Sequence, residues 1–162
     1  MLRAVTLTQP WSGLVASGIK LIENRPRRMI KPADFGKPFA LHASREIDVD
    51  VYQLITARAP ELKGLSDIEG EWFRLSRITS AVIAIATIDR ELHGWTEDSI
   101  REHEETLRMQ LGDQYRWFFG PVGYVLRDVR VLPVPVDCKG ALGFWTLPAE
   151  VEEKVRAQLV IG

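Results

Sequence analysis

The stretch Ala81-Val82-Ile83-Ala84-Ile85-Ala86-Thr87-Ile88 is apolar at nearly every position. A short continuous apolar run is typical of a strand that is buried on both faces. We therefore expect residues 81–88 to form the best-defined core element of the fold.

Strand patterns occur on both sides of this segment. Apolar and β-branched residues predict strands at 4–8, 21–25 and 39–43. Residues 124–132 are predicted to form either a hairpin or one long bent strand. The prolines that follow at 133 and 135 cannot donate to a ladder, so this piece must lie at an edge of the sheet or leave it.

Helical patterns fill most of the remaining chain. Thr8 is expected to cap a helix that has Pro10 in its first turn and ends at Gly18, and Thr96 to cap a long polar helix. The other predicted helices are less strongly marked by caps. All the predicted helices cover residues 10–17, 47–58, 67–75, 96–111 and 149–159.

About six short strands with peripheral helices, and without regular β-α-β alternation, predict an α+β fold. Its sheet should be mixed or mostly antiparallel and curled into a barrel. The length of 162 residues suits one domain, so we expect a single domain over residues 1–162. The single cysteine, Cys138, can form neither an internal disulfide nor a CxxC metal knuckle.

The sequence also suggests a location. No apolar run approaches the roughly 18 residues that a membrane span needs. Met1-Leu2-Arg3-Ala4 leads into a strand pattern and not into a signal-peptide core. We therefore expect a cytoplasmic protein with no membrane partner.

The net charge of −1 hides an uneven distribution. Residues 1–45 carry eight bases and two acids, whereas residues 46–115 carry seven bases and fifteen acids. A basic section on an acidic protein can attract an anion locally while the rest discourages indiscriminate binding to nucleic acid. The alternative is that the basic stretch 25–37 is only a solvated loop.

Common catalytic and cofactor motifs are missing from the sequence. It contains no GxxxxGK[ST] or GxGxxG phosphate loop, no HExxH, no acidic calcium loop and no GxSxG elbow. The three histidines, His42, His93 and His103, lie far apart without metal-ligand spacing. We expect neither a cofactor nor a metal site.

Polar residues concentrate beside the first predicted helix, at Gln9-Pro10-Trp11 and along residues 18–25. Two-residue alternation places Glu23 and Arg25 on one face of a strand, where they present an acceptor and a planar donor together. Lys20 joins that face only if it still lies in the turn after Gly18. The alternative is a structural ion pair that closes the end of a barrel.

These residues carry a family resemblance. Gln9-Pro10-Trp11 followed by Gly18-x-Lys20-x-x-Glu23-x-Arg25 resembles the signature of the ASCH domain, a member of the PUA-like superfamily of small β-barrels. Four further segments resemble the strands of that family. They are Leu41-His42-Ala43-Ser44, Ala81 to Ala86, Gly120-Pro121-x-Gly123-Tyr124, and Lys139-Gly140-x-x-Gly143-x-Trp145. The matches cover about half the chain, and the helices near 47–75 and 96–111 are predicted insertions.

The resemblance implies a cleft beside the first helix that binds RNA or another nucleic acid. It also implies an alternative, because some bacterial ASCH proteins are amidohydrolases of acetylated cytidine and use a lysine at the position of Lys20. Glu23 stands where those hydrolases carry threonine, and a variant with glutamate there resembles the domain of a eukaryotic transcription coactivator. A metal-assisted ribonuclease is a third possibility that the family offers.

We therefore predict binding of RNA or a nucleotide, with N4-acetylcytidine hydrolysis as the alternative. In an enzyme, Lys20 and Glu23 would be the catalytic residues, and burial beside Arg25 would lower the pKa of Lys20 while Glu23 would oppose that shift. Trp11 is either a stacking face or a core residue, and Trp117, Phe118 and Phe119 are expected in the core. The predicted ligand-binding residues are Trp11, Lys20, Glu23, Arg25, Arg27, Arg28, Ser44 and Tyr124, and Lys31 extends the basic track.

Overall fold

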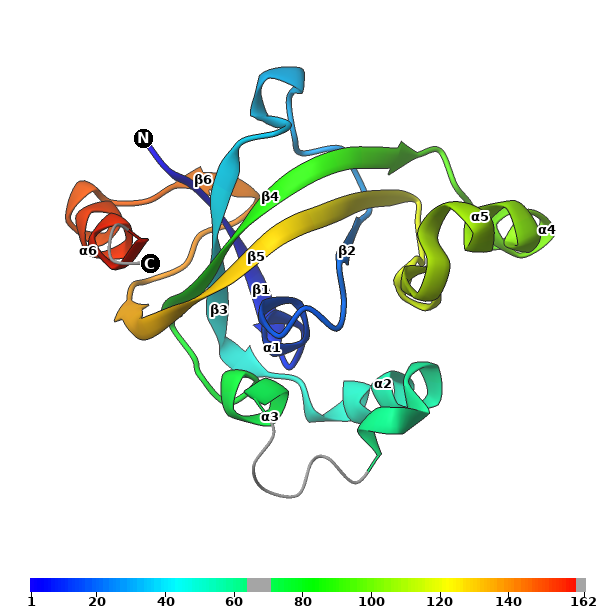
Figure 1. The fold of residues 1–162 in the computed structure, drawn as a ribbon, viewed down its shortest axis with the longest axis horizontal. Helices are drawn as coiled ribbons and strands as arrows, with labels where there is room; N and C mark the ends of the chain where they lie inside the picture. Colours follow the sequence, from blue (N-terminus) through cyan, green and yellow to red (C-terminus); the bar gives the residue numbers. More distant parts are fainter. Residues whose placement is uncertain (64–70, 160–162) are drawn as a thin grey trace.

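A mixed sheet of six strands lies at the centre of the structure, a computed structural model that describes residues 1–63 and 71–159 (Figure 1). The strands are β1 Arg3–Gln9, β2 Ile22–Arg25, β3 Pro38–Ile47, β4 Ala81–His93, β5 Val122–Asp137 and β6 Phe144–Thr146. They are ordered β2-β5-β4-β3-β1-β6. β1 and β3 are parallel, and the other neighbours are antiparallel. The predicted α+β class with a mixed sheet is confirmed.

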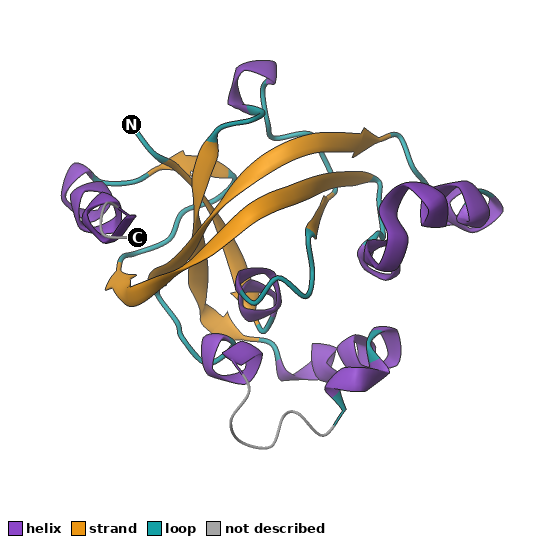
Figure 2. Ribbon diagram, viewed as in Figure 1, coloured by secondary structure: helices purple, strands orange, loops and turns teal. Residues whose placement is uncertain are grey.

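Short helices surround this sheet (Figure 2). In the described residues the α-helices are α1 Trp11–Ala16, α2 Tyr52–Arg58, α3 Glu71–Leu75, α4 Glu97–Glu102, α5 Glu104–Leu111 and α6 Ala149–Leu159. Single 3-10 turns occupy Pro32–Asp34, Val49–Val51 and Pro60–Leu62, and a longer one occupies Gly112–Trp117. None of the helices in this part of the chain is long and apolar enough to cross a membrane.

The stretch 81–88 of β4 is buried at every position, as its composition predicts. Ile83 and Ile88 pack into the cluster that also holds Val15 of α1. Val82 and Ile85 pack on the opposite side, with Val151 and the rest of the buried face of α6. Residues 81–88 are therefore covered on both faces, which explains why this part of β4 carries almost no polar side chain.

The sheet is curled but stays open, so the predicted barrel is not confirmed. Its edge strands are β2 and β6. β6 has three residues and pairs only with the first part of β1, Arg3 to Val5. From Thr6 onward that side of β1 has no strand partner among the described residues, and the side chain of Arg25 in β2 reaches the Thr6 carbonyl at 3.4 Å. A side chain thus bridges the place where a closed barrel would have a ladder.

The strand pairing defines the bounds and edge positions of the other predicted strands. Residues 122–137 form one long strand, bent where Asp128 takes a φ of 53°. β2 pairs only with Val122 to Val125, so Pro133 and Pro135 lie where β5 is the edge of the sheet, as predicted. β3 and β4 both run further than the apolar pattern indicated.

Helix boundaries depend on capping. Thr96 caps α4 as predicted, because its hydroxyl accepts from Ser99 N at 3.1 Å and the Ser99 hydroxyl accepts from Thr96 N at 2.8 Å. The single helix predicted over 96–111 is interrupted at His103. The helix predicted over 67–75 is seen from Glu71 onward, and residues 67–70 lie outside the described part. The 3-10 turn Val49–Val51 begins the helix predicted over 47–58.

The prediction that Thr8 caps α1 is wrong, since the N-cap residue is Pro10, whose side chain makes no capping hydrogen bond. Gln9 serves this end of the helix instead, because its side-chain oxygen accepts from Gly13 N at 3.0 Å. The Gln9 amide nitrogen donates to the carbonyls of Leu75 and Ile78, at 2.6 and 2.7 Å. This fully buried glutamine therefore ties α1 to the end of α3.

Candidate functional site

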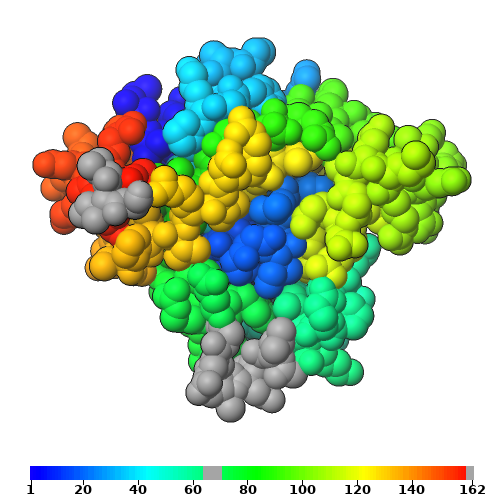
Figure 3. Space-filling view, in the orientation of Figure 1, coloured from blue at the N-terminus to red at the C-terminus, as the bar shows by residue number. Residues whose placement is uncertain are grey.

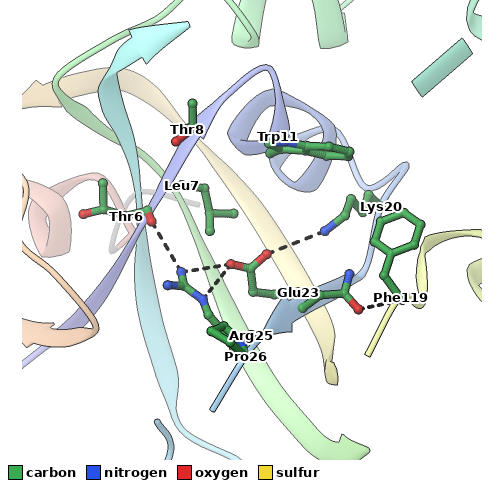
Figure 4. A pocket seen from close by; sticks show the side chains of 10 residues that line it. Thr6, Leu7, Thr8, Trp11, Lys20, Glu23, Arg25, Pro26 and Phe119 are labelled. Atoms are coloured by element: carbon green, nitrogen blue, oxygen red, sulfur yellow. Dashed lines mark hydrogen bonds and ion pairs between the residues drawn. The ribbon is translucent and has the colours of Figure 1, made fainter. Parts of the chain in front are cut away.

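A cleft of about 330 Å³ lies between β1, α1 and β2, at the place where the sheet does not close (Figure 4). We call it the Lys20 cleft. In the space-filling view the blue segment around α1 is visible between β5 and the yellow-green region of α5 (Figure 3). The residues that line the cleft are Thr6, Leu7, Thr8, Trp11, Lys20, Glu23, Asn24, Arg25, Pro26 and Phe119.

Glu23 is the centre of the charged cluster in this cleft. Its Oε2 accepts from Arg25 Nε at 3.0 Å and lies 2.9 Å from Arg25 Nη2. Its Oε1 lies 3.6 Å from Lys20 Nζ, so one carboxylate faces two cations (Figure 4). Because Glu23 and Arg25 are two residues apart on β2, they share a face of the strand, as predicted.

Lys20 reaches this face because it lies in the turn before β2. Gly18 takes a φ of 79°, a conformation that glycine adopts without strain, and ends the helical turn. The backbone N–H groups of Ile19 and Lys20 both donate to Leu14 O at 3.1 Å. The sequence left open whether Lys20 lies on the same face as Glu23 and Arg25. The turn after Gly18 places it there, with its side chain directed toward Glu23.

The ammonium group of Lys20 is held in a largely dry site. The residue is only 2% exposed, and its Nζ donates to the Ile22 carbonyl. The same nitrogen lies 5.4 Å from the centre of the Trp11 ring. Burial lowers the pKa of Lys20 below its usual 10.5, whereas Glu23 acts in the opposite direction and Arg25 adds to the lowering.

Trp11 and Phe119 supply the aromatic wall. Both are half-buried and line the cleft, so Trp11 is not a fully buried core residue. Phe119 is positioned by Asn24 of β2, whose side-chain oxygen accepts from Phe119 N at 2.8 Å and Gly120 N at 3.2 Å. The Asn24 amide nitrogen donates to Trp117 O at 2.8 Å, which fixes the turn from both sides.

Sequence reasoning found four of the lining residues, Trp11, Lys20, Glu23 and Arg25, and missed the others, which are Thr6, Leu7, Thr8, Asn24, Pro26 and Phe119. Asn24 lies between Glu23 and Arg25, and its position beside them was the one signal that pointed to it. Phe119 was expected in the core with Trp117 and Phe118. Those two are indeed buried, but the turn held by Asn24 brings the next ring to the cleft.

The predicted basic track lies outside the cleft. Arg27 and Arg28 are exposed and do not line it, and Lys31 is exposed as well. Arg28 Nη2 pairs with Glu91 at 2.7 Å. These bases therefore lie beyond Pro26 at the edge of the cleft, where they face solvent.

Two other predicted ligand residues lie elsewhere. Ser44 does not line the Lys20 cleft; it lines another cavity of about 510 Å³ with Arg45 and Lys139, which we call the Ser44 cavity and which shares only Thr6 with the Lys20 cleft. Tyr124 pairs with Glu23 in the register of β2 and β5, but the residue is fully buried, so no ring face is free for stacking. Its hydroxyl accepts from the backbone N–H of Met29 at 2.8 Å, which ties the basic loop to the core.

Metal-ligating side chains are scattered in the structure. Over residues 1–63 and 71–159, no group of three or more His, Cys, Asp or Glu side chains is placed to hold a metal ion. His42 lies buried in a hydrogen-bond network, with Nε2 at 2.7 Å from Cys138 O and Nδ1 at 3.2 Å from the Thr6 hydroxyl. Trp145 Nε1 donates to the same hydroxyl at 3.0 Å.

Comparison with solved structures identifies proteins of the same fold. The crystal structure of ASCH from Zymomonas mobilis superposes with a TM-score of 0.54 and 16% sequence identity, over 96% of this chain and 93% of that one. Crystal structures of a Ser-to-Ala and a Tyr-to-Phe mutant of ZmASCH give TM-scores of 0.53 at the same identity. They cover 96% of this chain and 94% and 96% of theirs.

The structural neighbours of this chain are thus ASCH domain proteins, and the recognition predicted from the Gln9 to Arg25 segment is confirmed for the fold. No family model matches the sequence, and no curated protein matches it either.

Proposed function

We propose that the Lys20 cleft binds a nucleotide, free or as part of single-stranded RNA. The observation that supports this most strongly is the placement of Glu23, Arg25 and Lys20 on one wall, beside the rings of Trp11 and Phe119. A carboxylate and a guanidinium can recognise the donor and acceptor edge of a base, and aromatic rings can stack on its face. The ASCH fold of the chain supports the same ligand class.

The dimensions of the cleft favour a small recognition unit. A volume of about 330 Å³ is near the lower end of ligand pockets, and it suits one nucleoside. Phosphate groups outside the cleft would meet the exposed Arg27 and Lys31. We keep the predicted cytoplasmic location, with RNA or a nucleotide as the partner.

Salt dependence of RNA binding tests this proposal. A labelled single-stranded oligonucleotide should bind weakly, because the basic section offers few phosphate contacts and the acidic middle repels the backbone. Three or four contacts predict a log-log salt slope of about −2 to −3. Arg27→Gln removes the base next to the lining residue Pro26, so it should weaken binding and flatten that slope. Arg130→Gln removes another exposed arginine on β5, outside the basic stretch 25–37, and should change neither. Binding that is independent of salt, or no binding at low salt, would discard the proposal.

A second candidate is hydrolysis of N4-acetylcytidine to cytidine and acetate. The observation in its favour is that burial lowers the pKa of Lys20, which makes a neutral amine more accessible than on an ordinary lysine. A neutral Lys20 amine can accept the proton of an attacking water, and the Glu23 carboxylate lies 3.6 Å away to share it.

Chromatographic assay of nucleoside turnover separates the two candidates. If Lys20 acts as a base, Lys20→Arg should abolish hydrolysis while ligand affinity stays within a few-fold, because a guanidinium keeps its proton at neutral pH. If the cleft only binds, the wild type shows no hydrolysis, and Glu23→Gln weakens ligands that donate hydrogen bonds. We expect the second result, and lysine-dependent turnover would reverse the ranking.

A further inference from the structure

A third cavity, of about 430 Å³, adjoins the Lys20 cleft, and Phe119 lines both. We call it the Arg58 cavity. It is built by residues from α2, α4 and the turn that follows α5. Its lining residues are Arg58, Glu97, Ile100, Arg101, Tyr115, Phe118 and Phe119. A ligand that extends from the Lys20 cleft past Phe119 therefore reaches a cavity that is also lined by aromatic residues.

Phe119 is contacted from both sides, by Asn24 and by Arg58. Asn24 fixes its backbone from β2, as described above. On the other side the guanidinium of Arg58 lies 5.0 Å from the centre of its ring. A guanidinium stacked on an aromatic ring presents its outer plane and its N–H edges, so it can meet a base or a phosphate.

Arg58 is the cation of this cavity that is open to a ligand. It is exposed and makes no ion pair within the described residues. Arg101 is paired with Asp98. Glu97 also lines the cavity and repels phosphate, so any phosphate must sit toward the Arg58 end, next to Phe119.

We propose that the ligand is a single-stranded polynucleotide of at least two nucleotides, bound across Phe119. This inference rests on the proposed function of the Lys20 cleft. The first nucleoside occupies that cleft, the linking phosphate meets the N–H edge of Arg58, and the second base stacks on the outer plane of the Arg58 guanidinium, beside Tyr115 in the Arg58 cavity. Base stacking on aromatic side chains tolerates any base, so the second position selects for chain length more than for sequence.

The test compares cytidine 5′-monophosphate with the dinucleotide pCpC by calorimetric titration at several salt concentrations. Stacking of one further base contributes about 1–3 kcal/mol. The dissociation constant of the dinucleotide should therefore be at least about fivefold lower than that of the mononucleotide, because about 1 kcal/mol of stacking energy corresponds to that factor. The one added phosphate contact should steepen the log-log salt slope by about 0.7.

Arg58→Gln should remove most of this gain and the added slope while leaving the affinity for the mononucleotide within about twofold, since Arg58 does not line the Lys20 cleft. The matched control is Arg77→Gln. Arg77 also lies 5.0 Å from a phenylalanine ring, that of Phe73, but it lines neither cavity, so the gain should persist. Tyr115→Leu keeps an apolar side chain and should weaken only the dinucleotide.

The outcomes separate the two proposals. If the mononucleotide binds but the dinucleotide gains nothing, or if the gain survives Arg58→Gln, the extended site is refuted and the nucleotide cleft stands. If neither ligand binds even at low salt, both proposals are refuted. Circular dichroism of each variant confirms that the comparison is made between folded proteins.

Discussion

Replacing Glu23 with glutamine should destabilise the protein far more than replacing Lys20 with methionine. Glu23 faces both Lys20 and Arg25, at 3.6 and 2.9 Å. The change to glutamine leaves two cations with no opposing charge in the cleft, and one of them is buried. Methionine in place of Lys20 leaves Glu23 paired with Arg25 and puts an apolar side chain in a dry site.

The expected magnitudes follow from burial. Removing one partner of a buried ion pair costs about 3–5 kcal/mol. The Glu23 side chain is 13% exposed, so we expect the lower end, about 3 kcal/mol, or a Tm lower by about 6–12 °C. Lys20→Met loses the bond to the Ile22 carbonyl but also removes the desolvation cost of an ammonium group, so its net effect should stay within about 1 kcal/mol.

Urea unfolding of the variants measures the difference directly. Glu104→Gln is the matched control, because it removes an exposed carboxylate 2.9 Å from Arg108, and such surface pairs contribute about 0.5 kcal/mol or less. The double variant Glu23→Gln with Lys20→Met should recover part of the loss. An equal loss of unfolding free energy in the two single variants, or a larger loss in Lys20→Met, would refute the view that Glu23 neutralises both cations of the cleft.

Two further predictions concern the scaffold. Gly13→Ala should lower the free energy of unfolding by about 1–3 kcal/mol, because a Cβ there would lie 2.5 Å from the backbone nitrogen of Ser76. Urea titration measures this change, and an unchanged midpoint would contradict the close packing of α1 on the end of α3. Burial lowers the pKa of His42 below 6.5, so the unfolded chain takes up the proton first and stability should fall as the pH drops through about 6.5. Urea unfolding between about pH 8 and pH 5 should show a larger fall in unfolding free energy for the wild type than for His42→Gln. Parallel plots of unfolding free energy against pH for the two proteins would contradict this prediction.

Local sequence patterns predicted the elements that are marked by a pattern within their own segment. The apolar run at 81–88 and the helix Ala149–Leu159 carry their own periodicity, and both are confirmed. Closure of the sheet is different, because it depends on how far β6 runs along β1. Because β6 has only three residues, the Thr6 carbonyl is bonded by the Arg25 side chain and not by a strand, and no pattern within either segment predicts the length of β6.

The candidate site shows the same division. Alternation along β2 placed Glu23 and Arg25 correctly on one face, since that relation lies within one strand. The position of Lys20 required the turn at Gly18, which the sequence left open. Tyr124 and Phe119 exchanged their expected roles, because strand register and the contacts of Asn24 decide which ring is buried and which reaches the cleft.

The measurement that tests the central claim most directly is an NMR titration of the ¹⁵N-labelled protein with cytidine 5′-monophosphate. The nucleotide cleft predicts saturable shifts of the backbone amides of Trp11, of residues 20–25 and of Phe119, with the amides of Ser44, Arg45 and Lys139 in the Ser44 cavity unchanged. Shifts confined to Arg45 and Lys139 in the Ser44 cavity, or no shifts at millimolar nucleotide, would contradict the assignment of the Lys20 cleft.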